Sequence, residues 1–190
     1  MHSVSVIDVP TGLVPGARQV LSPHCDARPH GTVPELLVVH GISVPAGEFG
    51  GRWIDRLFCG DLPAAEPRFA ALAGLRVSAH LLIDRRAVTS QYVPFHQRAW
   101  HAGLSNYRGR EACNDFSIGI ELEGTDELPY EDAQYRALAA LVIALRHAYP
   151  SLREEALVGH SDIAPGRKSD PGAAFDWEHL RALLQAPALR

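Results

Sequence analysis

The sequence predicts one α/β domain of the α+β kind, in which a central mixed β-sheet is flanked by helices. The first observation is length, because 190 residues is the size of one ordinary domain. The second is composition: with 46% apolar and 21% charged residues, the chain can bury a sizeable core, which excludes a disordered chain or a fibre. The third is the order of patterns, since short apolar runs alternate with segments of helical spacing.

The charge and the apolar runs exclude several kinds of partner. A net charge of −4 gives no broad positive field, so we expect no nucleic acid partner. No apolar run reaches the roughly 18 residues of a membrane span, and residues 1–20 are interrupted by polar, proline and glycine residues, so we expect neither a membrane span nor a secretory signal. Three separated cysteines favour a reducing cytoplasm. Nothing in the sequence indicates an obligate protein partner.

The first half of the chain predicts an arm, a strand and a hairpin. Residues 1–33 are rich in proline, glycine and polar residues and predict an irregular arm, which leaves 34–185 as the catalytic core of a single domain spanning 1–190. The aliphatic run 36–39 is typical of a strand buried on both faces, and it leads directly into His40. Residues 78–84 and 87–93 predict two strands of a hairpin.

The second half predicts an alternating strand and a long helix. Along 116–123 the side chains alternate, so Phe116 and Ile118 point to one face and Glu121 to the other. Apolar residues recur at helical spacing over 131–148, and Pro150 blocks continuation. Shorter helices are predicted at 52–58, 67–73 and 176–184, and a last strand at 156–159. The intervening segments 94–115 and 161–174 predict long loops, which in compact domains tend to be functional.

Three residues form a candidate metal set. His40 and His160 each close a predicted strand, and Asp170 lies in the loop that follows. Two imidazoles and a carboxylate suit catalytic zinc, which takes three protein ligands and leaves a position for water, whose pKa falls from about 15.7 to about 7. There is no HExxH motif, so the ligands would converge only through the fold. Spacing alone leaves open that these histidines are hydrogen-bonded core residues and that Asp170 is a turn residue.

Five strings indicate a family when they are taken together. In order along the chain they are LVVHGIS with PAGEFGG (37–51), RVSAH (76–80), RAWHAG (98–103), CNDFSIGIELEGTD (113–126) and GHSDIAPGRKSDPG (159–172). They resemble the AmpD-type N-acetylmuramoyl-L-alanine amidases, a group of zinc amidases related to phage amidases and peptidoglycan recognition proteins. The resemblance covers about residues 20–180, and it implies the mixed sheet already inferred.

The resemblance also implies roles for individual residues. It places one zinc ion on His40, His160 and Asp170, and catalytic work on Glu121 and Lys168. Glu121 would take a proton from the attacking water and pass it to the leaving amine, while Lys168 would stabilise the charge on the tetrahedral intermediate. For substrate binding, Arg76 would pair with a carboxylate of the stem peptide, and Trp100 and His101 would form a wall against the sugar.

The implied substrate is a small muropeptide. The bond cut would be the amide between the lactyl group of N-acetylmuramic acid and L-alanine. Members without a signal sequence act in the cytoplasm on 1,6-anhydro-muropeptides in cell-wall recycling, and this chain is similar to them. One position departs from the family: an Asn usually follows the first ligand histidine, and here Gly41 does, which predicts a missing contact to a substrate amide.

Other readings stay open at this point. A first alternative is a peptidoglycan-binding module without activity, and a second is a 2-His-1-carboxylate iron oxygenase, because His160 and Asp162 form an H-x-D string. Taken alone, Glu121 would be a solvated edge carboxylate and Lys168 an exposed loop charge. Trp100 and Arg76 would be ordinary packing and surface residues.

Overall fold

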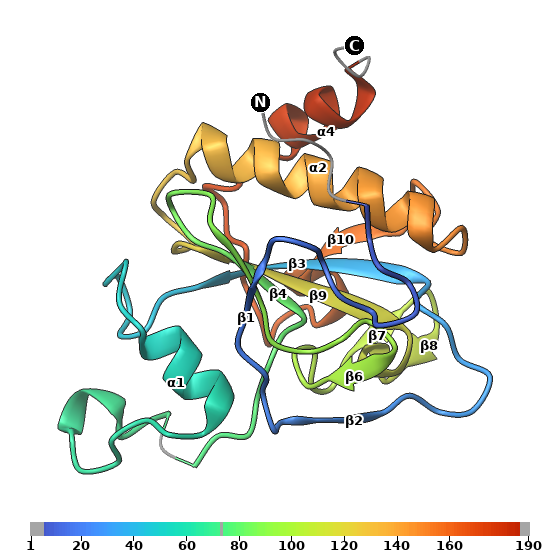
Figure 1. The fold of residues 1–190 in the computed structure, drawn as a ribbon. Helices are drawn as coiled ribbons and strands as arrows, with labels where there is room; N and C mark the ends of the chain where they lie inside the picture. Colours follow the sequence, from blue (N-terminus) through green and yellow to red (C-terminus); the bar gives the residue numbers. More distant parts are fainter. Residues whose placement is uncertain (1–5, 73, 187–190) are drawn as a thin grey trace.

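Two parallel strands form the middle of the sheet. The structure, a computed structural model, describes residues 6–72 and 74–186. In it β3 (Leu36–Ile42) pairs with β9 (Ser117–Glu123), and His40 lies directly opposite Glu121. Most of both strands is buried, as expected of central strands covered on both faces. Figure 1 shows the two strands crossing the molecule beneath a long helix, α2 (Asp132–Ala148).

Over the described residues the main sheet has the order β1–β5–β4–β9–β3–β10. Strand β4 (Leu81–Ile83) runs parallel to β9 and antiparallel to β5 (Thr89–Gln91), which confirms the predicted hairpin with shorter strands. One edge strand, β10 (Leu157–Gly159), is parallel to β3, and the other, β1 (Arg18–Gln19), is parallel to β5. The sheet is therefore mixed, as the sequence predicts.

One face of the sheet carries the main apolar core. Helix α2 lies across it, and α4 (Trp177–Gln185) packs on α2 (Figure 1). Apolar side chains at alternate strand positions, which include Leu37, Val39, Ile118 and Ile120, share one core with residues of α2, which include Leu138, Val142 and Leu145. The predicted helix is thus confirmed, and it begins after Glu131, whose N–H donates to the Gln134 side chain.

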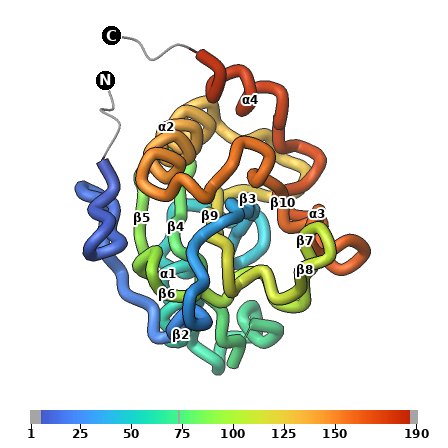
Figure 2. The backbone as a smooth tube through the Cα atoms, turned by 90° about the vertical axis from the view of Figure 1, so that its right-hand side faces the viewer, coloured from blue at the N-terminus to red at the C-terminus, as the bar shows by residue number. Residues whose placement is uncertain are grey.

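The opposite face is covered by shorter pieces. They are α1 (Trp53–Cys59) and a two-stranded ribbon of β2 (Cys25–Ala27) and β6 (Gln97–Ala99). Figure 2 shows these pieces on the side of the strands away from α2. A second ribbon, β7 (Asn106–Tyr107) with β8 (Arg110–Glu111), leads to a 3-10 turn before β9. After β10 the chain forms the short α3 (His160–Ile163).

Several predicted boundaries are wrong, and the reason is element length. The arm 1–33 is not wholly irregular, because it contains β1 and β2, and Ile7 and Val14 belong to the core. The supposed loop 94–115 contains β6, β7 and β8. Strands of two or three residues are too short to show periodicity. The helix expected at 67–73 is only a 3-10 turn, Pro67–Phe69, and residue 73 lies outside the described residues, as do 1–5 of the arm.

Two further details differ from the expectation. Phe116 precedes β9 and packs with Leu36 and Val38, not with the apolar face of Ile118. His40 lies within β3, which continues to Ile42. The division into arm and catalytic core stays a prediction. No helix of the described ranges is long and apolar enough to cross a bilayer.

Candidate metal centre and active site

His40, His160 and Asp170 meet on the sheet face opposite α2. Gly159 pairs with Val39, so His160, the next residue, lies beside His40 at the start of α3. The Nδ1 atoms of the two histidines are 3.0 Å apart, and each is 3.0 Å from Asp170 Oδ2. Both imidazoles are buried, whereas the Asp170 side chain is 16% exposed. The fold therefore gathers three donor atoms from positions up to 130 residues apart.

Hydrogen bonds behind the rings orient both histidines. His160 Nε2 lies 3.1 Å from the Ala102 carbonyl oxygen, which can only accept, so this nitrogen carries the proton and Nδ1 faces the centre with its lone pair. His40 Nε2 lies 2.9 Å from His101 Nδ1, and His101 Nε2 lies 3.0 Å from Ser117 Oγ. A proton on His40 Nε2, donated to His101, leaves the Nδ1 of His40 free as well.

The charge state of the set also suits a metal. Burial lowers the pKa of His40 to about 4, so this imidazole is neutral near pH 7. Burial alone would raise the pKa of Asp170, but its close contacts with His160 and His40 bring it well below its usual value. Two imidazole lone pairs and a carboxylate oxygen thus point at one spot, where a single cation satisfies all three. This donor set fits zinc.

Glu121 supplies an unpaired carboxyl next to the set. Its side chain is 7% exposed, and Oε2 is buried with no hydrogen-bond partner among residues 6–72 and 74–186. Burial raises the pKa of Glu121 well above its usual value, the charge of Asp170 raises it further, and Lys168 opposes both. A buried carboxyl with a free oxygen beside a metal set is suited to proton transfer.

Lys168 lies on the exposed loop between α3 and Asp170. Its backbone N–H donates to the Ala164 carbonyl at 3.0 Å, which fixes the turn that carries it. The positive charge of Lys168 lowers the pKa of both Glu121 and His40, so the ammonium acts on the same centre. Residues expected to be catalytic and residues expected to be ligands therefore share one electrostatic environment.

A family model described as N-acetylmuramoyl-L-alanine amidase matches residues 30–173. The chain belongs to this amidase family. It is 61% identical over 174 residues to the 1,6-anhydro-N-acetylmuramyl-L-alanine amidase AmpD of Escherichia coli K12. The aligned region covers 91% of this chain and 94% of that relative.

Solved structures agree with the family. A crystal structure of a selenomethionine AmpD derivative matches with a TM-score of 0.88 and 59% identity over 92% of this chain and 97% of that one. The amidase AmiD of E. coli, solved with the substrate anhydro-N-acetylmuramic acid-L-Ala-D-γ-Glu-L-Lys, matches with a TM-score of 0.59 and 31% identity over 82% of this chain and 60% of that one. The mixed sheet flanked by helices is thus the amidase fold.

The three residues expected to bind substrate occupy two different places. The Arg76 guanidinium lies 5.3 Å from the centre of the Trp100 ring, and the Trp100 indole N–H donates to Asp26 at 3.2 Å. His24 stacks on the same indole. His101, by contrast, is 9% exposed and contacts Nε2 of His40. This placement favours a role in supporting His40 over a contact with the sugar. Contacts of Arg76, Trp100 and His101 with substrate stay predictions.

Position 41 points away from His40, toward α2. A Cβ added to Gly41 would collide with the hydroxyl of Tyr130 and touch Pro171. Tyr130 donates to the Pro171 carbonyl at 2.9 Å, directly after the ligand candidate Asp170. A side chain at position 41 would therefore displace Tyr130 and the loop that carries Asp170. The expected loss of a substrate contact stays a prediction.

Sequence reasoning missed several supporting residues. Ser117 lies on the same face of β9 as Glu121, so the alternation of the strand could have indicated it. Arg167 donates to the carbonyls of Ala102 and Leu104, each at 2.6 Å, and no pattern in the sequence marks it. Tyr130 stands just before the long helix, and no pattern in the sequence marks it either.

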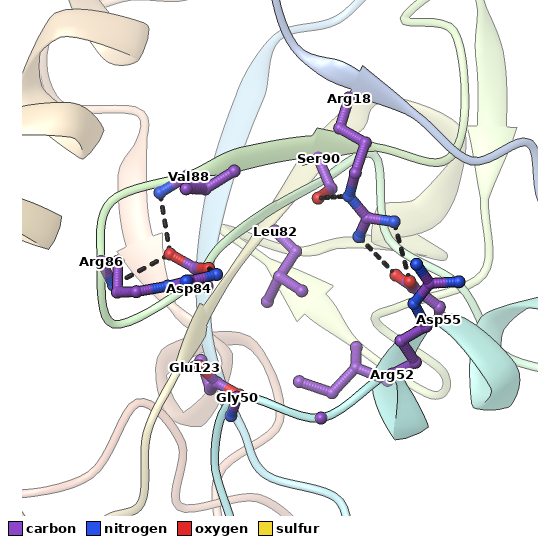
Figure 3. Close-up of a pocket in the computed structure, with 12 residues that line it drawn as sticks. Arg18, Gly50, Arg52, Asp55, Leu82, Asp84, Arg86, Val88, Ser90 and Glu123 are labelled. Atoms are coloured by element: carbon purple, nitrogen blue, oxygen red, sulfur yellow. Dashed lines mark hydrogen bonds and ion pairs between the residues drawn. The ribbon is translucent and has the colours of Figure 1, made fainter.

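A separate cavity lies between the β4–β5 hairpin and α1. It has a volume of about 240 Å³ and is shown in Figure 3. Three of its charged residues already have partners: Arg18 bridges Ser90 and Asp55, and Glu123 accepts the Gly50 N–H at 2.6 Å. The metal set does not line this cavity, so the candidate chemistry lies with His40, His160 and Asp170 rather than here.

Proposed function

We propose that this chain is a zinc-dependent amidase acting in peptidoglycan recycling. It hydrolyses the amide bond between the lactyl group of N-acetylmuramic acid, in its 1,6-anhydro form, and the L-alanine of a muropeptide. The observation that carries the proposal is the convergence of His40 Nδ1, His160 Nδ1 and Asp170 Oδ2 at mutual distances of 3.0 Å. Family membership supports the bond cut, and the identity to an AmpD named for the anhydro sugar supports the substrate.

His40, His160 and Asp170 would hold the ion. When bound, zinc supplies a Lewis acid that polarises a carbonyl and lowers the pKa of a water molecule. The protein contributes the imidazole of His40, which burial keeps neutral by lowering its pKa, the Nδ1 lone pair of His160, and one negative charge from Asp170. Asp162, the carboxylate that an iron oxygenase of the H-x-D type would need, instead accepts the Gly159 N–H at 2.7 Å, which favours the zinc amidase over that alternative.

Glu121 and Lys168 divide the remaining chemistry. Glu121 accepts a proton from the attacking water and delivers it to the leaving nitrogen of L-alanine, a task suited to a buried carboxyl whose pKa is raised well above its usual value. Lys168 stabilises the negative charge that develops on the carbonyl oxygen of the substrate. The opposite electrostatic influences of Asp170 and Lys168 on Glu121 support this pairing.

The substrate contacts are assigned by chemistry. Arg76 presents an exposed guanidinium next to Trp100, so it pairs with a carboxylate of the stem peptide while the indole borders the sugar. Two structural neighbours were solved with anhydromuramic ligands, which supports a muropeptide of this kind as the partner. Free thiols at Cys25, Cys59 and Cys113 support a reducing, cytoplasmic location.

The proposal is tested by peptide release from a 1,6-anhydro-muropeptide. We expect the purified chain to release the L-alanine peptide, to lose this activity to a chelator, and to regain it with Zn²⁺. Elemental analysis should find about one zinc per chain. Absence of release at every zinc level would leave the non-catalytic binding module, and iron in place of zinc would favour the oxygenase.

A further inference from the structure

One dipeptide lies behind both ligand histidines. The side chain of His101 contacts Nε2 of His40 at 2.9 Å, and the carbonyl of Ala102 contacts Nε2 of His160 at 3.1 Å. Each contact fixes the ring nitrogen that does not face the metal position. The orientation of both imidazoles therefore depends on where the backbone of residues 101–102 lies.

A single side chain holds this dipeptide. Asn114 Oδ1 accepts the His101 N–H at 3.1 Å and the Ala102 N–H at 2.8 Å. Asn114 is the middle residue of the 3-10 turn Cys113–Asp115, immediately before β9. Its own carbonyl accepts from the guanidinium of Arg28 at 3.2 Å, a side chain that also bonds the carbonyls of Asp115 and Ser117. Through Arg28, the backbone of Asn114 is thus connected to the start of β9, the strand that bears Glu121.

The space for His101 is equally restricted. A Cβ at Gly119 would lie 2.5 Å from the His101 ring, so this glycine on β9 leaves the room that the imidazole fills. His101 Nε2 meets Ser117 Oγ on the same strand at 3.0 Å. Strand β9 restrains the His101 ring, and Asn114 restrains the backbone of residues 101–102. A shift of the dipeptide would therefore press the ring against the backbone of β9.

We propose that Asn114 is a positioning residue of the metal centre, which acts through His101 and Ala102 on both ligand histidines. The inference rests on the proposed zinc site and adds to it a residue that touches neither metal nor substrate. Loss of the Asn114 oxygen leaves two backbone N–H groups without their acceptor and frees the segment that sets both imidazoles. Outer-sphere partners of this kind typically change metal affinity 10–100-fold.

The test compares Asn114→Ala with Asn114→Asp. The Asp variant keeps an oxygen acceptor for both N–H groups, at a position that is partly exposed. Zinc affinity is measured by competition with a chromophoric chelator, ligand geometry by the d–d absorption of bound Co²⁺, and stability by thermal unfolding of metal-free protein. We expect Asn114→Ala to weaken zinc binding by about 10–100-fold and to alter the Co²⁺ spectrum, and Asn114→Asp to restore both.

Ser22→Ala is the matched control. Ser22 is buried and also holds two backbone groups, accepting the His24 N–H at 3.0 Å and donating to the Phe58 carbonyl at 2.5 Å, but it has no contact with the metal set. It should lose thermal stability with zinc affinity unchanged. Equal zinc affinity in wild type and Asn114→Ala, or equal weakening in the Ala and Asp variants, would overturn the positioning role. A wild-type chain that binds no zinc would overturn the proposed function itself, and this inference with it.

Discussion

The two faces of β9 differ in chemistry although both are buried. Toward α2 the strand presents Ile118, Ile120 and Leu122, each 0% exposed. Toward α1 and the β2–β6 ribbon it presents Ser117, Gly119 and Glu121, of which Glu121 is 7% exposed. One seven-residue strand therefore stabilises the domain with one face and carries the proposed catalytic carboxyl on the other. Burial alone does not distinguish them, whereas the hydrogen bonding of the polar face does.

Asp170→Ala should have the largest effect on the polar face. It removes one of the three proposed ligands, so we expect zinc to be lost and amide hydrolysis to fall by more than the roughly 10–100-fold that an outer-sphere change causes. The metal-free chain should also lose some stability at neutral pH, because the lowered pKa of Asp170 means that the folded state favours its ionised carboxylate. Zinc content, peptide release and urea unfolding measure the three effects. Retained hydrolysis would mean that Asp170 is not a ligand.

Glu121→Gln should separate proton transfer from metal binding. We expect kcat to fall by about 10²–10⁴-fold, the range typical of a lost general acid–base, while zinc content stays unchanged. Glu123→Gln is the matched control, since Glu123 lies two residues further along the same face but is already bonded to the N–H groups of Gly50 and Arg85. Equal activity losses in both variants would argue against a specific role for Glu121.

Glu121→Gln should also change how the stability of the metal-free chain depends on pH. The pKa of Glu121 is raised in the folded state, so folding favours the protonated carboxyl. Metal-free wild type therefore loses stability as pH rises above the unfolded-state value of about 4.3 toward the folded-state pKa, whereas Glu121→Gln lacks this loss. Urea unfolding at pH 7 should find the variant more stable than wild type, and the difference should vanish near pH 4. A difference that is constant with pH would contradict the raised pKa.

Ile120→Ala tests the apolar face. Truncating a fully buried isoleucine should lower the free energy of unfolding by about 2–5 kcal/mol, with kcat close to wild type where the chain remains folded. Val88→Ala is the control, because Val88 is 44% exposed and should lose less than about 0.5 kcal/mol. Denaturant unfolding and peptide release distinguish stability from activity. A large loss of kcat in stable, folded Ile120→Ala would mean that the two faces are not separable.

Long periodic elements of this fold were predictable from the sequence. The alternation around Ile120 and the helical spacing before Pro150 reflect burial of one face, which the residue types record directly. The strands β1 and β7 have two residues each, and their pairing depends on neighbours far along the chain. Local pattern contains no information about such contacts, so these strands were missed.

The candidate site was predictable only in part, for a similar reason. His40, His160 and Asp170 were found because their donor atoms suit a metal and because the strings around them resemble a family. Residues that act through a backbone contact carry no such chemical mark. Asn114 accepts two backbone N–H groups. His101 was expected, from the family resemblance, to form a wall against the sugar together with Trp100. Its burial behind His40 depends on packing that the sequence does not display.

Tyr130→Phe should have the smallest effect. It tests a residue that connects the two faces of the sheet. Tyr130 packs with the apolar core on the side of α2, yet its hydroxyl bonds the Pro171 carbonyl next to Asp170. Removing the hydroxyl leaves a buried carbonyl without this donor, so we expect a loss of about 1 kcal/mol in unfolding free energy and a small decrease in zinc affinity. Tyr135→Phe is the control, because its hydroxyl accepts from the Asp176 N–H on the helical side. Equal zinc affinity in the two variants would mean that the apolar face does not support the Asp170 loop.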